Sequence, residues 1–187
     1  TSAMNAIAHA AEGFYAPDRN PVVIAMARDA MPAFRDALPV LVRDPLHRGA
    51  RAKALYAAWC CSTILGYITM ALHHKLAHVL GGSFGTPHAE THAILLSHTI
   101  GFNAAAVPDL MRPLDDTFGA PTGAGLWDVA QALNAPMRLS DLGLTEADPD
   151  RAADIAVKNP YANPRPFDRG DILNRPRAAW EGRRPGA

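Results

Sequence analysis

Residues 71–103, ALHHKLAHVLGGSFGTPHAETHAILLSHTIGFN, decide how this chain is expected to fold. Two apolar stretches flank the glycine-containing turn GGSFGT, and Thr86 followed by Pro87 is typical of a helix start. The segment therefore predicts a helix, a turn and a second helix that reaches about Asn103. It also contains six of the eight histidines in the chain.

The rest of the chain is expected to be helical as well. Expected helices cover about 1–16, 20–38 with a kink or break at Pro32, 47–74, 107–118, 126–136, part of 140–159, and 168–180 within a proline-rich surface wrap over about 159–187. Strand signals are nearly absent. The 47–74 segment has so little polar face after Lys53 that we expect it at the centre of the fold. The sequence predicts one all-α domain, a helical bundle spanning 1–187.

Composition excludes several classes of partner. Hydrophobic residues make up 49% of the 187 positions, and 18 basic residues balance 18 acidic ones, so no net field draws nucleic acid or anionic membrane. No apolar stretch predicts a membrane span or a signal peptide. The adjacent Cys60 and Cys61 are expected to be reduced, as in a cytoplasmic protein. The chain has no initiator Met and opens on a helix, so we expect it to be a piece of something longer.

The histidines form pairs at helical spacing. Asn5 and His9 lie one turn apart, as do His74 and His78, and the glycine turn allows His88 to fold back toward them. Neutral imidazoles gathered in a cleft suit either a metal site or hydrogen bonding to a substrate. Neither HExxH nor CxxC is present, so spacing alone leaves open whether this is a site or packing.

Other polar features are assigned structural roles. His47, His73 and His98 are interpreted as packed or surface residues. GGSFG has no preceding strand and no Gly-Lys-Ser/Thr, so it is a helix–helix turn, and RRPG near the end is expected to be a solvated tail.

Three stretches, TSAMNAIAHAAEGFYAPDRNP, the segment 71–103 and NPYANPRP, together resemble the maleylacetate reductases of the iron-containing (group III) alcohol dehydrogenase superfamily. The resemblance runs over essentially the whole chain. It is specific, because the wider superfamily usually has PHG where this chain has PHAETH.

The resemblance implies a set of site residues. An Asp and three histidines hold a divalent metal in metal-dependent members, and those positions fall on Asn5, His9, His74 and His88. The histidine beside the nicotinamide falls on His78. Asn5 replaces the Asp with a neutral, weaker ligand, as in maleylacetate reductases, which are generally regarded as not needing the metal. We therefore expect no metal, with Fe or Zn on those four residues as the alternative.

The remaining roles follow from the implied chemistry. His74, His78 and His88 are expected to be catalytic, and the expected substrate-binding residues are Asn5, His9, Lys75, Tyr161 and Arg165.

The resemblance also implies the reaction and its partners. It implies NADH- or NADPH-dependent reduction of maleylacetate to 3-oxoadipate in the degradation of aromatic compounds, with hydride added to the C=C bond and histidines stabilising the enolate. Superfamily members bind NAD(P) through an N-terminal α/β domain, and this chain resembles only the all-α domain after it. We expect a homodimer and no activity from the chain alone. The alternatives are a metal-dependent alcohol dehydrogenase domain, a non-catalytic fragment, or half of a split enzyme.

Overall fold

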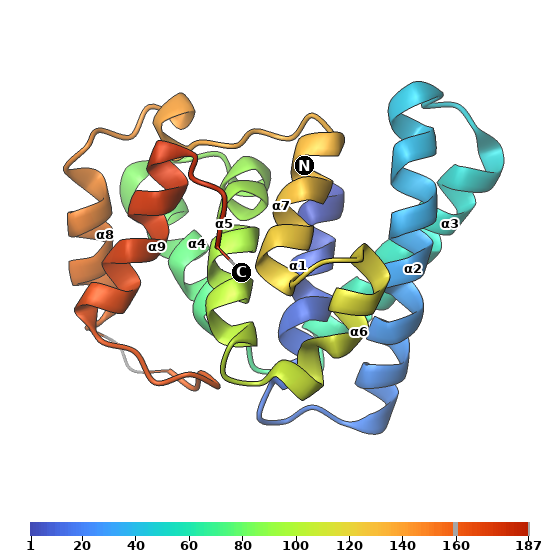
Figure 1. The fold of residues 1–187 in the computed structure, drawn as a ribbon, viewed down its shortest axis with the longest axis horizontal. Coiled ribbons are helices and arrows are strands. Elements are labelled where there is room, and N and C mark those ends of the chain that lie inside the picture. The colour runs from blue at the N-terminus through green and yellow to red at the C-terminus, as the bar shows by residue number, and fades with distance from the viewer. Residues whose placement is uncertain (159–160, 187) are drawn as a thin grey trace.

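The computed structural model describes residues 1–158 and 161–186, and within them it is helical with no strand (Figure 1). The elements are α1 (Ser2–Tyr15), α2 (Pro21–Arg43), α3 (Arg48–Leu65), α4 (Leu72–Phe84), α5 (His88–Ala104), α6 (Pro108–Phe118), α7 (Thr122–Ala132), the 3-10 helix η1 (Leu139–Leu142), α8 (Asp148–Ala156) and α9 (Arg169–Glu181). This confirms the all-α prediction. Part of the expected wrap, Asn159, Pro160 and Ala187, lies outside the described residues.

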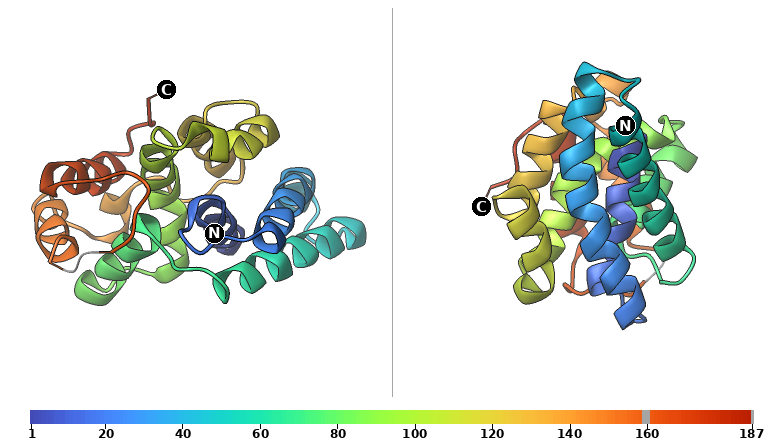
Figure 2. Two further views of the ribbon diagram at one scale, coloured as in Figure 1. Left: turned by 90° about the horizontal axis from the view of Figure 1, so that it is seen from below. Right: turned by 90° about the vertical axis from the view of Figure 1, so that its right-hand side faces the viewer.

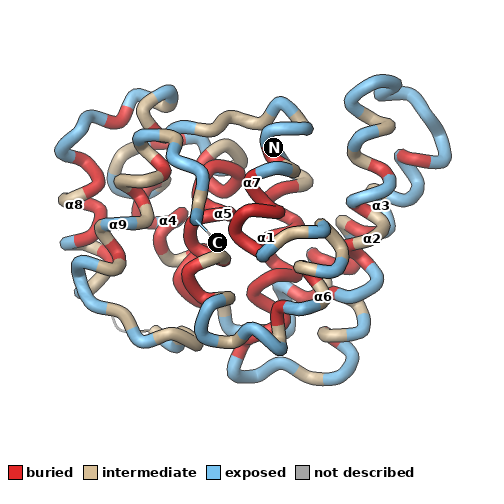
Figure 3. The backbone as a smooth tube through the Cα atoms, in the orientation of Figure 1, coloured by how far each residue is buried: buried red, intermediate tan, exposed pale blue. Residues whose placement is uncertain are grey.

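Helices α1 and α5 form the centre of the molecule (Figure 3). Helix α1 is buried from Ala6 to Tyr15, and α5 is buried from Thr91 to Ile100. Helices α2 and α3 lie on one side of this pair, and α4, α8 and α9 lie on the other (Figures 1 and 2).

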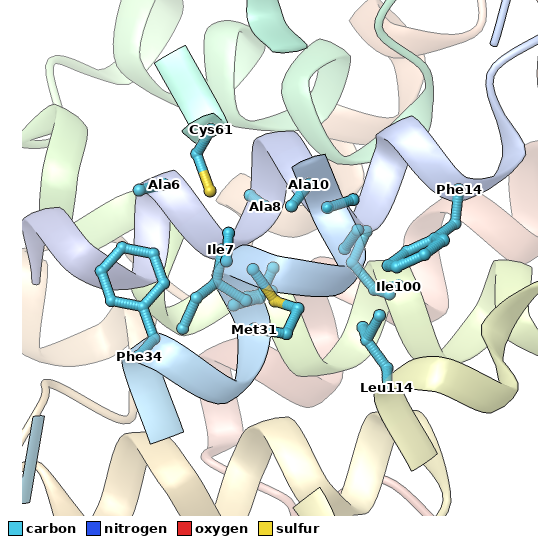
Figure 4. Close-up of a cluster of buried hydrophobic side chains, with 14 of the residues drawn as sticks. Ala6, Ile7, Ala8, Ala10, Phe14, Met31, Phe34, Cys61, Ile100 and Leu114 are labelled. Carbon is cyan, nitrogen blue, oxygen red and sulfur yellow. The ribbon is translucent and has the colours of Figure 1, made fainter. Parts of the chain in front are cut away.

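Helix α5 contributes side chains to two apolar clusters. One joins α1, α2, α3, α6 and α7 through side chains such as Ile7, Phe34 and Ile100 (Figure 4). The other joins α4, α8 and α9 through side chains such as Leu76 and Ile172. Because α5 contributes to both clusters, burial of apolar surface on its two faces holds the halves of the bundle together.

The prediction of one central helix over 47–74 is wrong. Helix α3 ends at Leu65, and the Asp18 carboxylate holds the following loop by accepting from Thr69 N and Oγ1 (2.9 and 2.7 Å). The helix lies at the edge of the bundle, where Leu55 and Trp59 are 69% and 61% exposed. Its packed face is narrow and consists of Ala50, Ala57, Cys60, Cys61 and Ile64, so overall apolarity did not indicate a central position.

Two expected interruptions are absent or shorter. Helix α2 continues through Pro32 and Pro39 to Arg43, since its buried Met31 and Phe34 anchor the flanking turns in the core. Half of the GAPTGAG loop is the first turn of α7, where a Cβ on Gly123 would lie 3.1 Å from Gly101 Cα. Glycine is needed there for the close approach of α5 and α7.

None of the helices in the described ranges combines the length and the apolarity needed to cross a membrane.

Candidate functional site

Five histidines from three helices meet where α1, α4 and α5 pack together. Ring centroids are 5.0 Å apart for His9 and His74, 4.9 Å for His74 and His92, 4.3 Å for His88 and His92, and 6.3 Å for His78 and His88. We call these five residues the histidine cluster. The convergence expected of His9, His74, His78 and His88 is therefore what the structure shows.

The histidine cluster extends from the protein interior to its surface. His92 is completely buried, and His9 and His74 are 8% and 5% exposed. His78 and His88 are exposed and form the mouth of the site. Only a ligand that reaches the interior can contact His9, His74 and His92. His78 and His88 are exposed and are therefore accessible to a second domain or a cofactor.

Glu12 fixes the orientation of His74. Its carboxylate is fully buried and accepts from Ala71 N (3.1 Å), His73 N (2.9 Å), His74 Nδ1 (2.7 Å) and the hydroxyl of Tyr15 (3.4 Å). The two backbone donors belong to the N-terminus of α4, where N–H groups lack helical partners. The carboxylate thus caps α4 and holds a proton on Nδ1 of His74, which leaves Nε2 free to act.

A second hydrogen-bonded chain fixes the tautomer of His92. The Thr99 hydroxyl donates to Leu95 O (2.9 Å), so its oxygen accepts from His73 Nδ1 (2.7 Å). Nε2 of His73 then accepts from His92 Nδ1 (3.0 Å), which leaves a lone pair on His92 Nε2. Both nitrogens of His73 are satisfied, which agrees with its predicted structural role.

Burial keeps the inner imidazoles neutral. Desolvation, followed by the neighbouring His74, lowers the pKa of His9 to about 4 and that of His92 to about 2. The same two causes lower the pKa of His78, and desolvation with the charges of His74 and His92 lowers that of His73. Near pH 7 these rings are therefore neutral, with one donor and one acceptor nitrogen each.

The floor of the site contains buried polar atoms without hydrogen-bond partners in the described part of the chain. They are Asn5 Oδ1, His9 Nδ1, His74 Nε2 and His92 Nε2. Such atoms are rare in folded proteins, and several of them near the exposed His78 and His88 are expected where a polar ligand binds.

The other predicted residues lie in two places. The Lys75 ammonium is 5.5 Å from the centroid of the Tyr161 ring, and its charge contributes to the lowered pKa of His78, so this pair borders the histidine cluster. The Tyr161 hydroxyl is buried and has no hydrogen-bond partner in residues 1–158 and 161–186, and desolvation, then the charge of Glu12, raises its pKa. Arg165 instead donates to Phe102 O at 3.3 Å and covers the Phe102 ring. The structure does not bring it to the histidine cluster.

Sequence reasoning missed Glu12 and His92. Each carried a signal, because Glu12 is three residues after His9 and His92 is four residues after His88, which places each pair on one helix face.

This chain belongs to the iron-containing alcohol dehydrogenase family. Residues 1–180 match the family model described as "Fe-containing alcohol dehydrogenase family, C-terminal". The match agrees with an all-helical chain whose imidazoles gather between α1, α4 and α5.

Within that family the chain is similar to maleylacetate reductases. It is 48% identical over 185 residues to the maleylacetate reductase of Rhizobium sp. strain MTP-10005, covering 99% of this chain and 53% of that protein. Identity to the Pseudomonas aeruginosa maleylacetate reductase is 45% over 190 residues, covering 100% and 53%. The crystal structure of maleylacetate reductase from Agrobacterium tumefaciens superposes with a TM-score of 0.97 at 49% identity, covering 98% of this chain and 53% of that chain. The chain spans about half the length of these relatives.

The residues do not fit the divalent metal that the family name implies. In residues 1–158 and 161–186, no group of three or more His, Cys, Asp or Glu side chains is arranged to hold a metal ion. Asn5 offers only a neutral amide oxygen, and the nearby carboxylate of Glu12 already accepts four hydrogen bonds. No step of the chemistry below is routed through a metal.

Proposed function

We propose that this chain is the substrate-binding half of an NAD(P)H-dependent maleylacetate reductase, which forms 3-oxoadipate. The observation that carries the proposal is the histidine cluster, in which burial keeps His9 and His92 neutral and four buried polar atoms have no partner among the described residues. Its similarity to maleylacetate reductases at 45–49% identity supports the choice of substrate.

The reaction requires hydride at one carbon and a proton at its neighbour. NAD(P)H, when bound, would supply hydride to the alkene carbon β to the ketone, and the C=C electrons would move to the ketone oxygen as an enolate. A proton then reaches the α carbon as the ketone re-forms. Donors fixed at the developing oxyanion lower the barrier, and losing one costs about 3–4 kcal/mol in characterised enzymes.

Each histidine of the cluster has a position that suits one of these tasks. His78 is exposed and would lie beside a bound nicotinamide, and His88 next to it would donate to the ketone oxygen. His74 delivers the proton from Nε2, because the Glu12 carboxylate at 2.7 Å balances the imidazolium that carries it. His9 orients the substrate at the buried floor.

Polar residues around the cluster hold the rest of the substrate. Asn5 lies one turn before His9 on α1 and orients the substrate with it. Lys75 pairs with one substrate carboxylate, and the unpartnered hydroxyl of Tyr161 donates to the same end of the molecule. Arg165 is given no role in this reaction because its guanidinium lies over Phe102 and not at the histidine cluster.

NADH or NADPH would be bound mainly by an N-terminal nucleotide-binding domain, in the same protein or in a separate chain. We further propose a cytoplasmic homodimer. Because the relatives are about twice as long, the proposed activity requires that second domain.

A metal-dependent alcohol dehydrogenase is the second candidate function. Membership of the Fe-containing family favours it, and Fe or Zn would then be bound by Asn5, His9, His74 and His88, although the neutral amide of Asn5 fits a metal poorly. A non-catalytic fragment or half of a split enzyme is the remaining alternative. Metal analysis of the purified chain separates the candidates, because near-stoichiometric metal supports the dehydrogenase.

The test joins this chain to the N-terminal half of the Rhizobium sp. maleylacetate reductase and follows NAD(P)H oxidation with maleylacetate. The fusion is expected to be active and the isolated chain inactive, since positioning the hydride donor contributes up to about 7–11 kcal/mol. In the fusion, His78→Ala should lower kcat more than it raises KM. His47→Asn, outside the cluster at the α3 cap, is the matched control and should change neither. Activity of the isolated chain would contradict the proposal.

A further inference from the structure

A second polar hollow lies on α5 and α9, away from the histidine cluster. It has a volume of about 390 Å³ and is lined by His98, Phe102 and four arginines, with the C-terminal residues 183–186 at its rim. His98 is six residues after His92, the member of the histidine cluster nearest to it on α5, so it lies about 9 Å farther along the helix at 1.5 Å per residue. The hollow is within the size range of small-molecule sites.

The arginines give the hollow positive charge that nearby carboxylates offset only in part, and the charge of Asp171, one turn earlier on α9, acts on Arg175. Arg183 pairs with Glu181, and Arg184 pairs with Asp128 at 2.7 Å. Arg165 and Arg175 form no ion pair with any described residue. Their guanidinium carbons lie 4.0 and 5.0 Å from the centroid of the Phe102 ring, which holds both groups at the hollow.

Two buried nitrogens in this hollow have no hydrogen-bond partner among the described residues. One is Nε of Arg175, whose guanidinium pKa is lowered chiefly by burial. The other is Nε2 of His98, on a side chain only 3% exposed. Burial, then the charges of Arg175 and Arg183, lowers the pKa of His98 to about 4. The field that opposes a proton on His98 favours an anion in the same place.

We propose that this hollow is a binding site for a small doubly charged oxyanion, distinct from the site of the proposed reaction. Two guanidiniums fixed on one aromatic ring match the paired oxygens of a carboxylate or phosphate. The Phe102 wall accommodates a short carbon chain, and His98 and Arg175 supply the unpartnered nitrogens. Arg183 and Arg184 of RRPG are exposed, as the sequence predicted for a solvated tail, and they also line this hollow.

The test titrates the 187-residue chain with inorganic phosphate and, separately, with succinate, at constant ionic strength set by chloride. Calorimetry measures the dissociation constant, and NMR follows the ring resonances of His98. Saturable binding of either anion with a shift at His98 is expected. Tighter binding of phosphate indicates a phosphate ester as the ligand, and tighter binding of succinate indicates a dicarboxylate.

Variants on one helix localise the binding. Arg175→Gln should weaken anion binding at least about tenfold, because it removes the charge that pairs with the bound anion in a partly buried place. Arg177→Gln, which pairs with Asp150 outside the hollow, is the control and should leave it unchanged. If Arg175→Gln does not fold by circular dichroism, Arg165→Gln replaces it. The proposal is overturned if Arg177→Gln weakens anion binding as much as Arg175→Gln does. It is also overturned if binding does not saturate up to about 10 mM anion, since even a weak site has a Kd of about 1 mM.

Discussion

Replacing Glu12 by Gln should destabilise the fold measurably, because this carboxylate accepts four hydrogen bonds in the interior. The amide keeps one oxygen for His73 N, but its NH₂ group opposes the N–H of Ala71. One buried donor left unpartnered costs about 1–3 kcal/mol, and loss of the negative charge at the α4 N-terminus adds about 1 kcal/mol. We expect a loss of about 2–4 kcal/mol, which is roughly 4–16 °C in Tm for a chain of this size.

The assay is urea and thermal unfolding followed by circular dichroism at pH 7. Glu146→Gln, at an exposed position, is the matched control and should lie within about 0.5 kcal/mol of the unaltered chain. Nitrogen NMR supplies a second readout, since a glutamine amide that donates to Nδ1 should move the His74 proton to Nε2. A Glu12→Gln variant as stable as the control, with Nδ1 of His74 still protonated, would refute the assigned role of Glu12.

Two further predictions concern stability. Because His9 and His98 have folded-state pKa values near 4 against an unfolded value of 6.5, the unfolded chain binds more protons between these limits. The fold is therefore most stable with respect to these two groups above pH 6.5, and it loses this stability progressively as the pH falls to about 4. The urea midpoint should be lower at pH 5 than at pH 7. A midpoint at pH 5 that equals or exceeds the midpoint at pH 7 would contradict the prediction. Gly123→Ala should lower the free energy of unfolding by about 1–3 kcal/mol, because its Cβ would lie 3.1 Å from Gly101 Cα and Ser97 O. Thermal unfolding measures this, and an unchanged Tm would show that α5 and α7 can move apart to accept the methyl group.

The helices were largely predictable because Asn20–Pro21 and Thr86–Pro87 are local signals. The central position of α5, and not of 47–74, was not predictable, since it depends on which faces find partners in three dimensions. Periodicity identifies an apolar helix but not its neighbours.

The candidate site was also predictable from the sequence only in part. The resemblance placed His9, His74, His78 and His88, and the structure brings them together. Glu12 was missed because an acidic residue on a helix normally indicates a solvent-exposed face, and its four donors come mostly from a segment about 60 residues away. Arg165 was placed by sequence near a substrate, but packing on Phe102 directs it elsewhere.

In the proposed reaction, the histidine cluster, with Glu12 behind His74, takes the place of the metal that the family name implies. The most direct test measures maleylacetate-dependent NAD(P)H oxidation by the fusion before and after removal of metals with a chelator. We expect the same turnover in both samples and no increase when Fe²⁺ or Zn²⁺ is added. Turnover that is lost on chelation and restored by either ion would contradict it and would favour the metal-dependent dehydrogenase.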